Sequence, residues 1–194
     1  SDQMLDTPTN NFATLNPLDT SPTGTISEGN LQQDSYTNTW RGIRSTYFVD
    51  SGKWYWEVEL NSGSGVDRGM VGVSNSNASL TTHADTNCRF FNAGGGQKYS
   101  SSSGVSYGDA SANGDIIGVA LDMDNGKIWW AINNVWQASG APASGTNEAF
   151  SGLSGYWSPD CRQYTTYNWV ANFGQDSSFA GEKTAQGNQD GNGI

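Results

Sequence analysis

The sequence GKWYWEVEL, residues 52–60, decides what kind of fold this chain adopts. Side chains alternate between the two faces of a sheet along an extended strand. The apolar face of this strand carries Trp54, Trp56, Val58 and Leu60, and the polar face carries Lys53, Tyr55, Glu57 and Glu59. Two indoles and two aliphatic side chains need a broad apolar partner, and a second β-sheet stacked about 10 Å away supplies one. The stretch therefore predicts a two-layer β-sandwich.

A β-hairpin is predicted around the Asn-Gly pair at residues 125–126. Residues 118–124 and 127–132 are alternating runs, and Asn-Gly between two such runs is the strongest short-range hairpin signal. A two-residue turn would place Leu121 opposite Trp130, with apolar pairs along that whole face.

The chain as a whole is predicted to be one all-β domain, residues 1–194. We expect residues 1–39 to hold an opening segment with an edge strand, residues 40–179 to form the sandwich body, and residues 180–194 to be a polar tail. A chain of 194 residues can bury roughly 70% of its extended surface in one core, so no second domain is required.

Further strands are predicted from short apolar or alternating runs. They lie at residues 25–27, 40–49, 69–73 and 167–173. Gly72, inside one of these runs, indicates that a neighbouring backbone approaches closely. Residues 74–115 are predicted to be one long loop, because Phe90-Phe91 is their one apolar island.

The charge balance excludes several classes of partner. The net charge is −10, and the nine Lys and Arg residues form no cluster in the sequence. Nucleic-acid binding needs such clusters, so we expect no nucleic acid as a partner. No apolar run approaches the ~20 residues that span a bilayer, and we therefore expect no membrane insertion.

Two cysteines and one histidine are the candidate metal ligands. Cys88 and Cys161 either form a disulfide that ties two long loops or are unrelated free thiols. Together with His83 they lack a recognised ligand spacing and a fourth ligand, so we expect no metal site. His83 is predicted to be solvated on a loop. No cofactor is expected, and the Asp- and Asn-rich segment 188–193 is the one weak candidate for calcium.

Four segments in succession resemble the strands of a SPRY domain. They are GKWYWEV at residues 52–58, VGV at 71–73, IGVALDMDNGKI at 117–128 and NFG at 172–174. Their order and approximate spacing match that family over most of the sandwich body. The resemblance implies a bent, two-sheet antiparallel β-sandwich, a concanavalin A-like jelly roll, whose loops bind partners. It implies no catalytic activity.

The opening residues are further similar to SPRY-type modules of bacteriophage virion and tail proteins. The similar stretches are DTPTNNF at residues 6–12 and LNPL at 15–18. This resemblance implies a location in the virion or outside the cell, with homo-oligomers formed through the parent protein. In such proteins the chain runs on past the position of Ile194 into another strand. The missing strand indicates a fragment, a processed product or a partly traced chain, and we expect an open sheet edge there.

Aromatic side chains in the loops are the predicted ligand contacts. Eight Trp and eight Tyr exceed the needs of one core, and exposed Trp and Tyr are common in sugar-binding and protein-binding loops. The candidate binding residues are Arg68, Tyr99, Tyr107, Tyr156, Trp157, Arg162 and Tyr164. We predict a non-enzymatic module of a phage virion or tail protein that recognises a host-surface glycan or receptor protein.

Two other functions stay open. An open sheet edge also suits a structural role, in which the domain docks onto neighbouring virion proteins. Glu57 and Glu59 lie two apart on one strand face, as paired carboxylates do in some glycoside hydrolases of concanavalin-like fold. That chemistry needs one acid with a raised pKa, which the spacing does not supply. We expect these carboxylates to form a solvated face.

Overall fold

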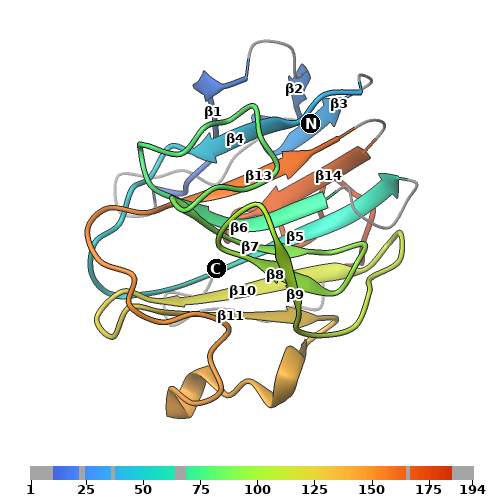
Figure 1. Ribbon diagram of the computed structural model, residues 1–194. Coiled ribbons are helices and arrows are strands. Elements are labelled where there is room, and N and C mark those ends of the chain that lie inside the picture. The colour runs from blue at the N-terminus through green and yellow to red at the C-terminus, as the bar shows by residue number, and fades with distance from the viewer. Residues whose placement is uncertain (1–10, 22–24, 36–37, 64–68, 165–166, 185–194) are drawn as a thin grey trace.

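The protein is a sandwich of two seven-stranded antiparallel sheets (Figure 1). The computed structural model describes residues 11–21, 25–35, 38–63, 69–164 and 167–184. Among these residues only two short 3₁₀ helices, η1 (Gln137–Ser139) and η2 (Pro142–Ser144), interrupt the all-β architecture. The predicted fold class is confirmed.

The first sheet, which we call the β6 sheet, has the strand order β1-β4-β13-β6-β7-β8-β9. Its strands are β1 (Leu15–Thr20), β4 (Arg41–Ser45), β13 (Ser158–Gln163), β6 (Gly69–Ser74), β7 (Cys88–Asn92), β8 (Gln97–Tyr99) and β9 (Gly104–Ser106). The second sheet, the β5 sheet, has the order β12-β11-β10-β5-β14-β3-β2. Its strands are β12 (Val135–Trp136), β11 (Lys127–Ile132), β10 (Ile116–Asp122), β5 (Lys53–Gly63), β14 (Tyr167–Asn172), β3 (Gln32–Ser35) and β2 (Thr25–Ser27).

Strand β5 lies at the centre of its sheet, between β10 and β14. Trp56, Val58 and Leu60 point inward and are buried in the main core, as predicted. Trp54 was expected to join them, but that prediction is wrong because 42% of its surface is exposed. It stands at the start of the strand, and its indole N–H folds back to donate to the Ser51 carbonyl oxygen at 2.8 Å.

The predicted hairpin of β10 and β11 is present, but its register differs. Leu121 lies opposite Ile128 rather than Trp130, because the connection is a four-residue loop, residues 123–126. The Asp122 carboxylate accepts a hydrogen bond from the Asn125 amide at 3.0 Å, which stabilises the longer turn. The register moves by two residues, so every side chain keeps its predicted face.

Residues 74–115 were predicted to be a long loop, and that prediction is wrong. They contain strands β7, β8 and β9, which complete one end of the β6 sheet. In β7, Phe91 belongs to the main core, whereas Phe90 belongs to a second cluster on the outer face. A strand buried on both faces shows no alternation of apolar and polar residues, so its sequence lacks the usual signal.

The cysteines form no disulfide, and the disulfide alternative is therefore wrong. Both thiols are free and buried. Cys161 lies in the main core between the sheets, and Cys88 lies in the cluster on the outer face of the β6 sheet. Burial raises the pKa of the Cys88 thiol to about 12 and that of Cys161 well above its usual range.

Native thiol reactivity tests this arrangement. We expect Ellman's reagent to titrate two thiols per chain after unfolding without reductant, and to react with neither at an appreciable rate in the folded protein. The reason is that the reactive thiolate is scarce when burial raises the thiol pKa. Fewer than two thiols in the unfolded, unreduced chain would contradict the structure.

Gly72 and Gly118 provide a matched pair of strand glycines. A Cβ at Gly72 would lie 2.0 Å from the backbone carbonyl oxygen of Arg89, which confirms the predicted close approach. A Cβ at Gly118 would instead meet the hydroxyl end of the Tyr55 side chain at 2.7 Å. A flexible side chain can move aside, whereas a strand backbone cannot do so without breaking its sheet.

Alanine substitution should separate the two positions. We expect Gly72→Ala to lower the free energy of unfolding by at least about 2 kcal/mol, and Gly118→Ala to change it by less than about 1 kcal/mol. Urea denaturation followed by tryptophan fluorescence measures both. Equal losses in the two variants would mean that β6 and β7 are not packed as described.

Candidate functional site

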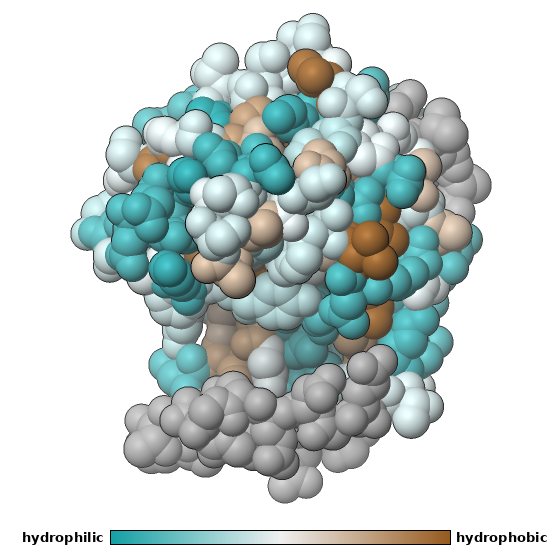
Figure 2. Space-filling view, turned by 90° about the horizontal axis from the view of Figure 1, so that it is seen from below, coloured by the Kyte–Doolittle hydropathy of each residue, from teal (hydrophilic) through white to brown (hydrophobic). Residues whose placement is uncertain are grey.

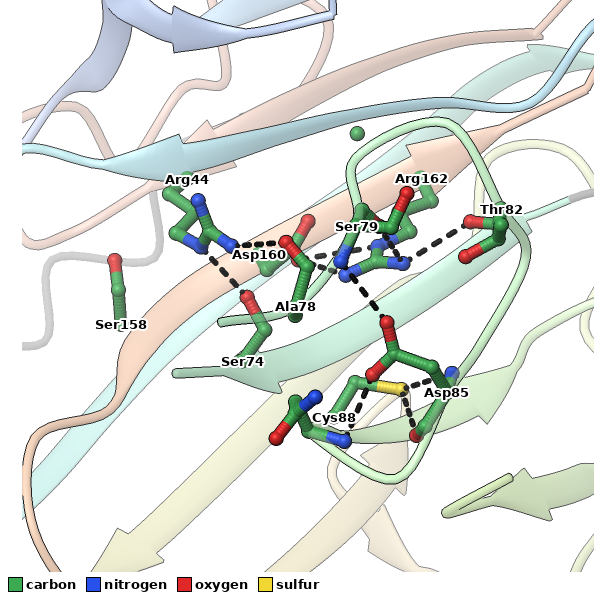
Figure 3. A network of polar contacts seen from close by, with 12 residues as sticks. Arg44, Ser74, Ala78, Ser79, Thr82, Asp85, Cys88, Ser158, Asp160 and Arg162 are labelled. Carbon is green, nitrogen blue, oxygen red and sulfur yellow. Dashed lines mark hydrogen bonds and ion pairs between the residues drawn. The ribbon is translucent and has the colours of Figure 1, made fainter. Parts of the chain in front are cut away.

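The candidate site is built on the segment of residues 75–87 between β6 and β7, which we call the 75–87 loop. It folds back over the outer face of the β6 sheet and reaches strand β4, where the Gly42 amide donates to the Leu80 carbonyl oxygen at 2.7 Å. Figure 3 shows the loop arching over side chains from β4, β6 and β13. The sheet therefore has a second layer on its outer side.

Arg162 is one of two arginines that hold the loop. It alternates with the core residue Cys161 along β13, so its side chain points to the outer face, where it is completely buried. Its guanidinium forms an ion pair with Asp160 at 2.8 Å. Its Nη1 donates to two loop carbonyl oxygens, those of Ser79 at 2.6 Å and Thr82 at 3.0 Å.

Arg44 on β4 is the second anchor, and it is almost as deeply buried. Its Nη2 donates to the carbonyl oxygens of Ala78 at 2.7 Å and Asn75 at 3.0 Å. Its Nε donates to the Ser74 hydroxyl at 2.9 Å, and its Nη1 pairs with Asp19 at 2.8 Å. Figure 3 shows Arg44 and Arg162 on opposite sides of Asp160 and Ala78. Asp19 and Asp160 thus neutralise the two buried cations, and carbonyl oxygens of the loop accept hydrogen bonds from both.

Asp85 closes the loop from within. Its carboxylate accepts hydrogen bonds from the amides of Ser79 at 2.9 Å and Asn87 at 2.7 Å. Its carbonyl oxygen accepts the thiol hydrogen of Cys88 at 2.9 Å. Because the inward polar groups are used in this way, the loop presents mainly short polar side chains to solvent. The exposed loop residues are Ser76, Asn77, Ser79, Thr81, Thr82 and Thr86.

An aromatic cluster borders one end of the loop. The ring of Trp40 lies 5.6 Å from that of His83 and 5.4 Å from that of Tyr164, and His83 lies 5.8 Å from Tyr99 in an edge-on arrangement. The Nε2 of His83 is 3.0 Å from the Ser102 carbonyl oxygen. The His83 side chain is therefore half-buried and packed against Trp40 and Tyr99, so the prediction of a solvated loop histidine is wrong.

The predicted binding residues fall into different places. Tyr99, Tyr164 and Arg162 lie at the 75–87 loop, although Arg162 is buried beneath it rather than exposed for a ligand. Tyr107 and Trp157 are buried in the main core. Tyr156 is 63% exposed. Arg68 lies outside the described residues. The roles of these side chains in ligand binding stay predictions.

The two glutamates of β5 have structural partners. Glu59 is buried and pairs with Lys183 at 3.1 Å, and Glu57 accepts a hydrogen bond from the Tyr55 hydroxyl at 2.8 Å. Only part of the expected solvated face is present, because Lys183 in the segment after β14 covers Glu59.

Within the described part of the chain, His, Cys, Asp and Glu side chains form no group of three that could hold a metal ion. The described helices include none long and apolar enough to span a bilayer.

Sequence reasoning missed Arg44, Trp40 and His83 as members of this site. The available signal was the alternation of Arg44 with Ile43 on a predicted strand, which places a charged residue on the face opposite the core. Nothing in the sequence shows that this face is covered. The hydrogen bond from Arg44 to Ala78 spans 34 residues and the one from Arg162 to Ser79 spans 83.

The buried ion pair gives a direct test of how the loop is held. We expect Arg162→Met to lower the free energy of unfolding by about 3–5 kcal/mol, because it leaves Asp160 buried without a partner. The double variant Asp160→Leu/Arg162→Met should lose less than the two single variants combined, by at least about 1 kcal/mol. Urea denaturation of all four proteins measures this coupling. Simple additivity would show that the pair does not act as a unit.

Comparison with known proteins places this architecture in a family. A family model described as SPRY domain matches residues 53–154. The chain is 31% identical over 140 residues to the ATP-dependent RNA helicase DDX1 of Xenopus laevis, covering 70% of this chain and 18% of the helicase. The structure of the SPRY domain of human HERC1 matches with a TM-score of 0.68 at 16% identity, over 84% of this chain and 99% of that domain. SPRY domains are in general non-catalytic modules that bind other proteins, and this chain belongs to the SPRY domain family.

Proposed function

We propose that this domain recognises a partner protein through the outer surface of the 75–87 loop and the adjoining aromatic cluster. The observation that carries the proposal is the anchoring of this loop by two buried arginines, Arg44 and Arg162. A loop fixed before binding loses little conformational entropy when a partner docks. The same loop also presents a row of hydroxyl and amide groups.

The chemistry of this surface suits a protein partner. Thr81, Thr82 and Asn77 are exposed and can donate and accept hydrogen bonds. Trp40 and Tyr164 at the loop's end are half-buried, so each still offers part of a rigid aromatic surface. Small polar groups beside aromatic rings are the combination found in antibody-like binding loops.

Other described surfaces offer less. Figure 2 shows that hydrophilic residues dominate the face seen from below, with small and separate hydrophobic patches among its described residues. The most exposed large hydrophobic side chains are scattered over different strands, with Leu18 on β1, Val105 on β9 and Val135 on β12. Isolated exposed hydrophobic residues are ordinary on protein surfaces. They do not mark a second broad docking face.

A role in a phage virion and recognition of a host-surface glycan form the second candidate function. The virion context rests on the resemblance of residues 6–18 alone. Tyr156 favours sugar binding, because it is 63% exposed and a free aromatic face can stack on a sugar ring. Under this candidate the ligand would contact Tyr156 rather than the 75–87 loop.

Peptide selection against the folded domain tests the first candidate. Peptides selected on the wild-type protein should bind Thr82→Arg at least about tenfold more weakly, because the new side chain blocks the loop surface. Ala143→Arg on η2, which adds the same charge to an exposed residue elsewhere, should bind them normally. Biolayer interferometry measures both affinities.

Two results would overturn the proposal. The first is a set of selected peptides that keep full affinity for Thr82→Arg and lose it with Ala143→Arg. The second is saturable binding to one class on a glycan array that Tyr156→Ala abolishes and Thr82→Arg does not change. The second result would establish the glycan candidate in its place.

A further inference from the structure

Arg89 and Lys98 lie together on the inner face of the β6 sheet, on the paired strands β7 and β8. Lys98 is opposite Phe91 and Arg89 is two residues before Phe91, so the two cations are diagonal neighbours on one face of the sheet. Both side chains are half-buried. Both also approach the ring of Phe150, with the Arg89 Cζ 5.6 Å and the Lys98 Nζ 5.1 Å from its centroid.

These two cations have no carboxylate partner among the described residues. Five other Lys and Arg side chains of the described chain form ion pairs: Arg44, Lys53, Lys127, Arg162 and Lys183. Arg89 and Lys98 do not, in a protein with 19 acidic and 9 basic residues. The pKa of Glu148 is lowered first by a backbone hydrogen bond, then by Lys127, with which Glu148 forms an ion pair at 3.4 Å, and last by the charge of Lys98. Because neither cation forms an ion pair with a carboxylate in the described part of the chain, each keeps its charge available for one.

Backbone carbonyl groups hold both cations in place and leave donors free. Arg89 uses only Nη1, which donates to the carbonyl oxygens of Thr86 at 3.0 Å and Cys88 at 2.6 Å. Lys98 donates one hydrogen bond, to the Ala149 carbonyl oxygen at 2.7 Å. Within the described residues, only the Nη1 of Arg89 donates hydrogen bonds, so its Nε and Nη2 have no acceptor there. That edge of a guanidinium is the fork that binds both oxygens of a carboxylate.

Aromatic rings surround the pair and reduce its contact with water. The Arg89 Cζ lies 5.3 Å from the Trp157 ring centroid, and the Lys98 Nζ lies 5.3 Å from that of Tyr107. Burial lowers the pKa of the Arg89 guanidinium, although an arginine stays charged at neutral pH. A charge-assisted hydrogen bond is stronger beside such rings than in open water.

We propose that Arg89 and Lys98 form a binding site for one carboxylate of a partner protein, either an acidic side chain or a C-terminal carboxylate. The net charge of −10 repels polyanions such as nucleic acid. A single carboxylate is repelled much less at long range, because salt screens distant charges, and it can still bind the guanidinium of Arg89. This inference goes beyond the proposed function, because the site lies on the inner face of the β6 sheet and the 75–87 loop lies on its outer face.

Short synthetic peptides test the site directly. The probes are acetyl-Gly-Glu-Gly-amide for a side-chain carboxylate, acetyl-Gly-Gly-Gly with a free C-terminus, and acetyl-Gly-Gln-Gly-amide as the neutral control. The readout is the indole N–H signal of Trp157 in ¹H–¹⁵N spectra, because Arg89 lies over this ring. We expect a saturable shift with one or both carboxylate peptides and none with the neutral peptide. The better of the two carboxylate peptides identifies the source.

Charge-neutral variants and salt provide the controls. Lys98→Met should weaken the carboxylate peptide at least about tenfold, whereas Lys53→Met, on an exposed lysine of β5, should leave its affinity unchanged. Raising the salt concentration should weaken binding to the wild-type protein, a test that holds even if Lys98→Met does not fold. An equal shift with the neutral peptide, full affinity of a folded Lys98→Met, or affinity that ignores salt would overturn the proposal.

Discussion

The buried ion pair of Asp160 and Arg162 is the interaction on which the outer layer of this protein depends. It places a full charge pair on the outer face of the β6 sheet, where a sandwich normally meets water. The desolvation of such a pair is tolerated only when its remaining donors are satisfied. The carbonyl groups of the 75–87 loop supply the acceptors for Arg162, as they do for Arg44. The loop and the arginines therefore hold each other in place.

The parts of the fold that depend on alternation could be predicted from the sequence. Val58 and Leu60 on β5 lie in the core because one face of that strand is apolar, and the β10–β11 hairpin follows from its Asn-Gly pair. The hairpin register could not be derived, because the Asp122 side chain selects a four-residue turn. Strand β7 escaped prediction because Phe90 and Phe91 are buried on opposite faces.

The site was harder to predict than the fold. An aromatic residue in a predicted loop can lie in the core or on the surface, and Tyr107 and Trp157 lie in the core. Arg162 was predicted to contact a ligand, but its partner Asp160 and the loop above it bury it completely. Contacts between residues far apart in the chain decide these outcomes. The family resemblance predicted the architecture and the class of function, but it did not predict which surface residues bind a partner.

Amide hydrogen exchange of the 75–87 loop tests the central claim most directly, because a recognition loop held by buried charges should open only with the sheet beneath it. Ser79 and Asn87, whose amides donate to Asp85, and Ala78, whose amide donates to the Asn75 carbonyl oxygen, are the reporters. We predict that these amides exchange as slowly as those of the central strands β6 and β13. Exchange at the rate of an unstructured peptide would contradict the account.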